Sequence, residues 1–175
     1  MKLLITGACG HIGSYLAQNI HKIKNVRKCY LIDNIKNTSI NALFKSKKKN
    51  KLKFYINDLT HKDSLNNFKD IDYVIHLASM TNAASSFKRK NEMYRNNLKC
   101  MKNIINFCIK NKVKLIHISS TSVYGKQADI VDENCEKKYL KPQSPYADIK
   151  LLEEKMLKKI SKKIKYTTFR FGTIS

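Results

Sequence analysis

Short apolar runs alternate along this chain with longer segments in which apolar residues recur at helical spacing. The runs are typical of buried strands and cover 2–5, 29–32, 52–56, 73–78, 114–119 and 165–170. Helical spacing recurs after the first run, over 91–111, and between the fifth and sixth runs. Because repeated strand–helix units require right-handed crossovers, the pattern predicts a parallel sheet with helices on both faces.

The same pattern predicts which side of each helix is buried. The expected apolar stripes are Ile12, Leu16, Ile20 and Ile23 in the first helix, Leu98, Met101, Ile105 and Ile109 in the longest, and Leu152, Met156, Ile160 and Ile164 in the last. Two short helices are also expected, over 39–44 and 62–68, and a lysine-rich loop over 45–53. The lysines between positions 155 and 165 are expected to lie on the solvent-exposed face of the last helix.

The glycines between the first strand and the first helix indicate a nucleotide-binding loop. Gly7, Gly10 and Gly13 follow the run 2–5 directly, in a Gly-x-x-Gly-x-x-Gly variant of the dinucleotide fingerprint. Such glycines let the backbone turn tightly and approach a pyrophosphate at the helix N-terminus. Together with the strand pattern they predict a Rossmann-type doubly wound sheet, with strand order 3-2-1-4-5-6.

An acid at the end of the second strand favours NAD over NADP. Asp33 lies 20 residues beyond Gly13, the spacing at which a carboxylate accepts hydrogen bonds from the adenosine ribose. The same carboxylate repels a 2′-phosphate. In a doubly wound sheet ligands bind beyond the carboxyl ends of the strands. The positions at or just beyond such ends are Gly7, Asp33, Asp58, Ala78 and Ser120.

A tyrosine and a lysine mark the candidate chemistry. Tyr146 and Lys150 are four residues apart on a predicted helix, so they share one face. A neighbouring cation favours the phenolate, and we therefore expect the pKa of Tyr146 to fall toward working pH. Ser120 ends the fifth strand 26 residues upstream. Its hydroxyl either assists Tyr146 or satisfies a nearby backbone group.

Length and composition fit one α/β domain spanning residues 1–175. No apolar run is long enough to cross a bilayer, and the first strand enters the glycine loop directly, without a signal peptide. The five cysteines include no Cys-x-x-Cys pair and the five histidines are scattered, so neither disulfides nor a metal site is expected. These features predict a cytoplasmic protein.

The formal net charge of +22 raises the alternative of a nucleic-acid partner. The basic residues are mostly dispersed lysines, with neither an arginine cluster nor an aromatic stacking platform. Lysine, asparagine and isoleucine are abundant together, which indicates AT-rich coding. We expect the charge to attract anionic substrates and cofactors, and nucleic-acid binding is disfavoured.

The ordered motifs together resemble the extended short-chain dehydrogenases/reductases of the NAD-dependent epimerase/dehydratase family, most of all the UDP-galactose 4-epimerase type. The resemblance covers nearly the whole chain. It rests on Thr6-Gly7-x-x-Gly10-x-x-Gly13, Asp33-Asn34 with Asn37, Asp58-Leu59, His76-Leu77-Ala78, Asn97, the run 119–125 and the run 142–150.

The resemblance implies NAD as cofactor and a nucleotide-sugar as substrate. It implies Tyr146 as the acid/base, Lys150 as the residue that holds the nicotinamide ribose, and Ser120 as a hydrogen-bond donor to the reacting oxygen. His76 and Tyr124 are expected to be structural. The implied cofactor-binding residues are Gly7, Gly10, His11, Ile12, Gly13, Asp33, Asn34, Asn37, Asp58, Leu59, Leu77, Ala78, Ser79, Asn97, Tyr146 and Lys150.

The chain also departs from the family's pattern. Related dehydratases carry an Asp-Glu pair after the catalytic hydroxyl, where this chain has Thr121 and Ser122, so dehydration is disfavoured. Thr173 stands where epimerases have a substrate-binding asparagine. The resemblance implies that the C-terminal substrate domain of extended members is missing after Ser175.

Three functions therefore stay open at the sequence level. The first is an NAD-dependent nucleotide-sugar epimerase or related sugar oxidoreductase, truncated relative to the family. The second is an NAD-binding module or regulatory subunit without catalysis, and the third is a basic nucleic-acid binder. A homodimer formed through the long helix and the Tyr-Lys helix is expected from the resemblance.

Overall fold

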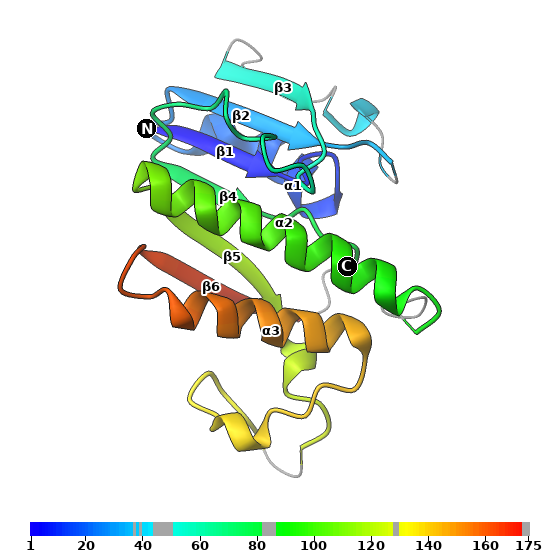
Figure 1. Ribbon diagram of the computed structural model, residues 1–175. Coiled ribbons are helices and arrows are strands. Elements are labelled where there is room, and N and C mark those ends of the chain that lie inside the picture. Colours follow the sequence, from blue (N-terminus) through cyan, green and yellow to red (C-terminus); the bar gives the residue numbers. More distant parts are fainter. Residues whose placement is uncertain (37, 39, 44–50, 82–86, 128–129, 173–175) are drawn as a thin grey trace.

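Six parallel strands form one sheet in the order β3-β2-β1-β4-β5-β6 in the computed structural model (Figure 1). The strands are β1 (Lys2–Thr6), β2 (Lys28–Asp33), β3 (Leu52–Ile56), β4 (Tyr73–His76), β5 (Lys114–Ser120) and β6 (Tyr166–Phe171). The structure describes residues 1–36, 38, 40–43, 51–81, 87–127 and 130–172. The predicted fold class and strand order are confirmed.

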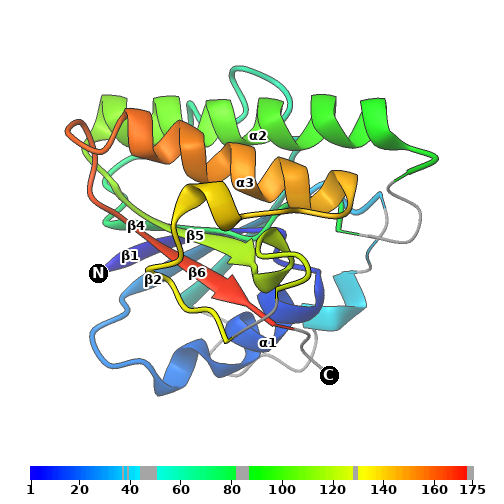
Figure 2. The same ribbon diagram turned by 90° about the horizontal axis from the view of Figure 1, so that it is seen from below.

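Helices cover both faces of this sheet (Figure 2). Helices α2 (Lys90–Asn111) and α3 (Pro145–Lys159) lie side by side on one face. On the other lies α1 (His11–Asn19), followed by the 3₁₀ turn η1 (Ile20–Lys22) and packed near η2 (Ile40–Leu43). Two further 3₁₀ turns, η4 (Thr121–Val123) and η5 (Lys137–Tyr139), lie between β5 and α3.

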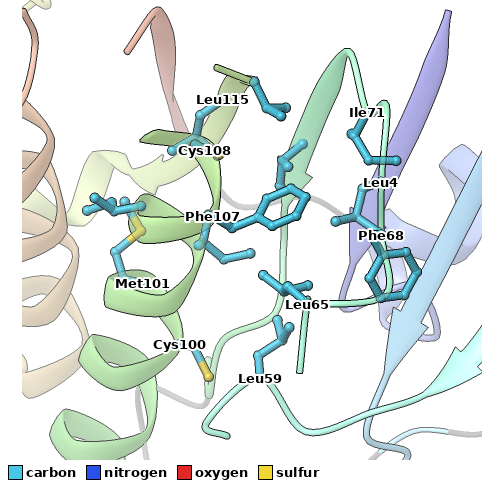
Figure 3. Close-up of a cluster of buried hydrophobic side chains, with 14 of the residues drawn as sticks. Leu4, Leu59, Leu65, Phe68, Ile71, Cys100, Met101, Phe107, Cys108 and Leu115 are labelled. Atoms are coloured by element: carbon cyan, nitrogen blue, oxygen red, sulfur yellow. The ribbon is translucent and has the colours of Figure 1, made fainter. Parts of the chain in front are cut away.

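Each face of the sheet has its own hydrophobic core. Under α2 and α3, Phe107 points toward Leu65 and Phe68, which belong to the segment after β3 (Figure 3). Leu4 of β1 and Leu115 of β5 complete this cluster from the sheet. Under α1 a second cluster is built from the alternate strand positions, among them Leu3, Ile5, Cys29 and Leu31. The central strands are therefore buried on both faces, as continuous apolar runs predict.

Local signals fix the start of α3 and the end of α2. The side chain of Ser144 accepts a hydrogen bond from the backbone N–H of Ala147, and Pro145 occupies the first turn. Helix α2 ends at Asn111 and is followed by the C-cap residue Lys112, whose φ of 55° lies in the left-handed region. The Lys112 N–H returns to the carbonyls of Cys108 and Ile109, which caps the helix.

Three predicted elements differ from the structure. Residues 62–68 form successive turns rather than the expected helix, with bonds such as Ser64 N–H to His61 O and Phe68 N–H to Leu65 O. Their apolar side chains are buried without a helical ladder, so burial alone produced the misleading pattern. The fourth strand ends at His76, two residues early, and the Ala78 N–H bonds to the Thr6 hydroxyl instead of a strand carbonyl. The expected helix 39–44 is the 3₁₀ turn Ile40–Leu43, and positions 39 and 44 lie outside the described residues.

The predicted helix stripes are displaced from the buried faces. In α2, Leu98 and Ile109 are only half-buried, whereas Asn97, Met101 and Ile104 are fully buried. In α3, Leu152, Met156 and Ile160 are half-buried, and Ile164 lies beyond the helix end. The buried face of α3 instead carries Ala147, Ile149, Lys150, Glu153 and Leu157. In the first helix Ile23 is exposed, because α1 gives way to η1 after Asn19.

Candidate functional site

A cavity of about 1100 Å³ lies along the carboxyl edge of the sheet. Its walls come from the segments that follow β1 to β5, from the first half of α2, from the first two turns of α3, and from the end of β6. All five positions predicted from strand ends line it: Gly7, Asp33, Asp58, Ala78 and Ser120. The expectation that these ends share one site is confirmed, because parallel strands place their carboxyl ends together.

The glycine loop brings the backbone of β1 against the segment after β4. Gly7 has a φ of 69°, and a Cβ there would lie 2.7 Å from Ala78 N. A Cβ at Gly13 would lie 2.8 Å from Ala8 Cα and nearer still to the Gly7 carbonyl oxygen. Both positions therefore require glycine for close packing. Gly10 precedes α1 and supplies no side-chain cap, so the first N–H groups of α1 face the cavity uncapped.

A buried histidine fixes the loop that follows β4. Thr6 Oγ1 and His76 Nδ1 are 2.8 Å apart, and the same hydroxyl accepts weaker bonds from the N–H groups of Leu77 and Ala78. Burial lowers the pKa of His76 to about 3, so its ring is neutral at physiological pH. This matches the expected structural role of His76, although its edge also touches the cavity.

The carboxylate of Asp33 is already engaged by its own protein. One oxygen accepts from Cys9 N–H at 2.9 Å, and the other accepts from Ile35 N–H at 2.8 Å and from Thr38 Oγ1 at 2.9 Å. A carboxylate offers about four lone-pair sites, so roughly one remains for an external donor. Asp33 thus both orders the loop after β2 and faces the cavity.

Asp58 carries an ion pair at the same end of the cavity. Lys36 Nζ lies 2.7 Å from Asp58 Oδ2, and Thr60 donates to Oδ1 through both its N–H and its hydroxyl. Although burial works against the charged form, these hydrogen bonds lower the pKa of Asp58 to about 2. Lys36 was not among the predicted site residues; its place beside the predicted Asp33-Asn34 segment was the available signal.

Asn97 of α2 lies behind the cavity wall instead of on it. Its side chain is fully buried, accepts from Met80 N–H at 2.8 Å, and donates to Ser79 Oγ and Met80 O. Ser79 and Met80 line the cavity. Asn97 therefore holds the segment after β4, and its influence on a bound cofactor is exerted through that segment.

Tyr146 and Lys150 share one face of α3 and both line the cavity, as their spacing predicts. Lys150 Nζ lies 5.9 Å from the centre of the Tyr146 ring. The ammonium is nearly buried and bonds to Glu153 Oε2 at 2.9 Å. Glu153 was not predicted, because a single glutamate three residues after a lysine is an ordinary helix pattern.

The pKa of Tyr146 corrects the sequence expectation. Burial raises the pKa of Tyr146 above its ordinary value; Lys150 acts to lower it, and the Glu153 carboxylate acts to raise it. The expected fall of the Tyr146 pKa toward working pH is therefore wrong. Desolvation outweighs the lysine, whose charge is largely neutralised by its own partner.

Ser120 is the last residue of β5 and faces the cavity. Its Oγ accepts from the Ser122 hydroxyl at 2.8 Å and from the Ser122 N–H at 3.2 Å. The structure thus contains the second alternative, in which the Ser120 hydroxyl satisfies a nearby backbone group. A serine hydroxyl that accepts two bonds still has its own proton to donate, so the assisting role is compatible with the same geometry.

The cavity gathers nearly all of the predicted residues. Those that line it are Gly7, Gly10, His11, Ile12, Gly13, Asp33, Asn34, Asp58, Leu59, Leu77, Ala78, Ser79, Ser120, Tyr146 and Lys150. Asn37 and Thr173 lie outside the described residues. Lining residues that the sequence did not single out include Lys36, Met80, Arg89, Asn96 and Phe171. Among the described residues, no helix is long and apolar enough to cross a membrane.

The fold and this site define a dinucleotide-binding protein of the short-chain dehydrogenase/reductase class. The family model described as "NAD dependent epimerase/dehydratase family" matches residues 3–175. The chain therefore belongs to the NAD-dependent epimerase/dehydratase family, whose cofactor is NAD.

Relatives include both branches of the family's name. The chain is 30% identical to a UDP-glucose 4-epimerase of Yersinia enterocolitica over 92% of its own length and 49% of the relative's. It is 31% identical to a dTDP-D-glucose 4,6-dehydratase of Dictyostelium discoideum, over 94% of this chain and 41% of that protein. The structure of a UDP-N-acetylglucosamine 4-epimerase from Methanobrevibacter ruminantium superimposes with a TM-score of 0.86 at 27% identity, covering 97% of this chain and 54% of that one. The chain thus spans about half the length of these proteins.

Proposed function

We propose that residues 1–175 form the cofactor-binding and catalytic domain of an NAD-dependent nucleotide-sugar epimerase. The observation that carries the proposal is the convergence of the glycine loop, Ser120, Tyr146 and Lys150 on one cavity. The epimerase and dehydratase relatives support the substrate class, which this chain shares through its family.

The residues of the cavity fit NAD. The uncapped N-terminus of α1, together with the close turn at Gly7 and Gly13, leaves space and N–H donors for a pyrophosphate. The free acceptor of Asp33 suits a ribose hydroxyl, and its negative charge disfavours a 2′-phosphate. Asp58 and Leu59 would border the adenine, and Lys150 the nicotinamide ribose.

When bound, NAD supplies the acceptor and donor of a hydride. The chain's own part is to move a proton and to orient the sugar. Tyr146 Oη, as phenolate, removes the proton from a sugar hydroxyl while that carbon is oxidised, and returns it when the keto sugar is reduced. Ser120 Oγ donates a hydrogen bond to the reacting oxygen. Lys150 favours the phenolate by its charge.

Two cavity residues favour epimerisation over dehydration. Elimination of water needs a general acid and a general base beside the hydroxyl group that leaves. Thr121 and Ser122 line the cavity at the two positions where related dehydratases carry an Asp-Glu pair, and neither residue has a carboxylate. Epimerisation instead returns the hydride to the opposite face of the same carbon, after the keto sugar has turned over, and needs no acid or base beyond Tyr146 and Ser120.

A dimer through α2 and α3 belongs to the same proposal. The two helices lie side by side on one face (Figure 2), and their apolar residues Leu98 and Leu152 are only half-buried. A second copy would bury them. Light scattering of the purified chain would measure twice the mass of 20.3 kDa if this is correct.

Thermal denaturation with and without NAD tests cofactor binding. We expect NAD to raise the melting temperature of the wild-type chain and to have little effect on Asp33→Asn, each compared with its own cofactor-free value. Asp63→Asn is the matched control, since this aspartate is exposed and bonds only locally to Asn66. No shift for the wild type at saturating NAD would refute the proposal.

An NAD-binding module without catalysis is the second candidate. The raised pKa of Tyr146 favours it, because a neutral phenol is a poor base at physiological pH. Incubation with UDP-glucose and UDP-galactose separates the two candidates. Interconversion that disappears in Tyr146→Phe supports the enzyme, whereas NAD-dependent stabilisation without interconversion supports the module.

A further inference from the structure

Two successive carboxylates of α3 fasten this helix to the last two strands. Glu154 accepts from Ser119 of β5 and, through two hydrogen bonds, from Arg170 of β6. Glu153 accepts from His117, two residues before Ser119 on the same face of β5. His117 pairs in turn with Thr168 of β6. Each carboxylate thus has its own partners on the sheet, and only Glu153 also bonds to Lys150.

One oxygen of Glu153 joins a strand residue to the candidate catalytic lysine. Glu153 Oε2 lies 2.9 Å from His117 Nε2 and 2.9 Å from Lys150 Nζ. The side chains of His117 and Glu153 are 0% and 1% exposed, and that of Lys150 is 6% exposed. A buried ion pair of this kind is held in one geometry, because separating its members would leave a charge without a partner.

The protonation states of His117 and Glu153 follow from their surroundings. Burial lowers the pKa of His117, so the ring is neutral at physiological pH. Its Nε2 then donates to Glu153, and Nδ1 accepts from the Thr168 hydroxyl at 3.3 Å. Burial works against the charged form of Glu153, but the charge of Lys150 and the hydrogen bonds from His117 and Lys150 lower its pKa to about 2. Glu153 and Lys150 therefore form one neutral pair beside Tyr146.

We propose that Glu153, backed by His117, is a positioning residue that holds the Lys150 ammonium beside Tyr146 and neutralises it. With its charge neutralised, the lysine alone does not activate the tyrosine. This inference rests on the proposed function, because it takes Tyr146 and Lys150 as the catalytic pair. The contacts of Glu153 with Lys150 and His117 are present in the structure whichever function holds. Activation then requires a further positive charge or a rearrangement of Lys150.

The other titratable groups that act electrostatically on Glu153, Lys150 and His117 are either neutral or already paired. They are Tyr146 and Glu154 on α3, His76 on β4 and Cys100 on α2. Burial keeps His76 neutral and raises the pKa of the Cys100 thiol to about 12. Glu154 is paired with Arg170. Removal of Glu153 would therefore leave Lys150 as the dominant charge beside Tyr146.

Titration of Tyr146 in the purified, cofactor-free chain tests the proposal. The tyrosinate absorbance of each protein is compared with that of the same protein carrying Tyr146→Phe, so that the difference reports Tyr146 alone. We expect Glu153→Gln to increase the ratio of tyrosinate to phenol about tenfold at a given pH, a change of one pKa unit. Glu154→Gln is the matched control: it removes the neighbouring carboxylate of α3 but not the partner of Lys150, and it should change the fraction much less.

Equal titration of Tyr146 in the wild type and Glu153→Gln would overturn the proposal, as would equal shifts in Glu153→Gln and Glu154→Gln. If Glu153→Gln does not fold, the pair is removed jointly in Lys150→Met/Glu153→Gln and compared with the wild type. A pair without net charge is then replaced by two neutral side chains, so the titration of Tyr146 should change little. A tenfold or larger loss of tyrosinate at the same pH would overturn the proposal, because Lys150 would then have acted on Tyr146 as an unneutralised charge in the wild type.

The outcome is separable from that of the proposed function. Failure of the wild-type chain to respond to NAD refutes the proposed function and leaves the titration result intact. A normal NAD response with an unchanged Tyr146 titration in Glu153→Gln refutes only the positioning role.

Discussion

A side chain at Gly13 would collide with the carbonyl oxygen of Gly7, six residues earlier in the chain. The first turn of α1 packs directly on the glycine loop, and no flexible side chain stands between the two backbones. The turn that shapes the cavity therefore depends on the absence of a Cβ at Gly13.

We expect Gly13→Ala to destabilise the chain by about 1–3 kcal/mol through overpacking. It should also abolish the NAD-dependent rise in melting temperature, because α1 must shift away from the loop. Chemical denaturation measures the first effect and thermal denaturation with NAD the second. Gly172→Ala is the control, since Gly172 lines the same cavity and a Cβ there meets nothing within 4 Å. Equal effects of the two substitutions would contradict this account.

Asn97 should matter for cofactor binding without facing the cavity. Asn97→Ala leaves Met80 N–H without its acceptor, and we expect a loss of about 1–3 kcal/mol in the free energy of unfolding. The NAD-dependent stabilisation should weaken as well, because Ser79 and Met80 lose their anchor. Asn106→Ala, an exposed asparagine of the same helix, is the comparison. Full NAD response in Asn97→Ala would show that the cavity wall does not need this support.

Acid should destabilise the chain from about pH 6.5 downward. Burial lowers the pKa of His76 to about 3 and also lowers that of His117, whereas both would titrate near 6.5 in the unfolded chain. The unfolded state therefore binds more protons below pH 6.5, and stability present above that pH is lost as the pH falls. Each histidine contributes a slope of at most about 1.4 kcal/mol per pH unit. Glu153, whose pKa is about 2, adds to the loss below about pH 4.5.

Denaturant unfolding at a series of pH values measures this slope. His76→Gln should flatten the curve between about pH 6.5 and 4.5, because one buried neutral ring is removed. His61→Gln is the control, since His61 is exposed. A wild-type stability that stays constant over this interval would refute the neutral assignment of His76 and His117.

The bond between Arg170 and Glu154 should anchor α3 to β6. Arg170 donates to the two oxygens of Glu154 at 3.0 and 2.7 Å, with both side chains mostly buried. We expect Arg170→Met to cost about 3–5 kcal/mol, since it leaves a buried carboxylate unpaired. Arg89→Met provides a close comparison, because Arg89 makes the same two-bond contact with Glu92 at the surface. Loss of that exposed pair should cost much less, because water screens it, and equal losses would contradict the argument.

The sequence predicted the sheet and its edge well, for a physical reason. Buried parallel strands are continuous apolar runs, and the order of the segments follows from right-handed crossovers. It predicted helix faces less well, because the buried faces of α2 and α3 include Asn97, Lys150 and Glu153. When some buried positions of a helix are polar, a pattern that counts only apolar residues places the predicted buried face at the wrong angle around the helix. The predicted helix over 62–68 failed for the converse reason, since its apolar residues are buried in turns.

By itself the sequence determined the features that depend on local spacing: the glycine turn, the acid that ends β2, and the tyrosine and lysine one helical turn apart. The tertiary structure decided the charge environment of that pair. His117, Glu153 and Thr168 belong to β5, α3 and β6, and they meet only because the helix packs in one register on these strands. Spacing places Tyr146 beside Lys150, but burial and Glu153 determine the proton affinity of the tyrosine, and these depend on contacts between residues distant in the chain.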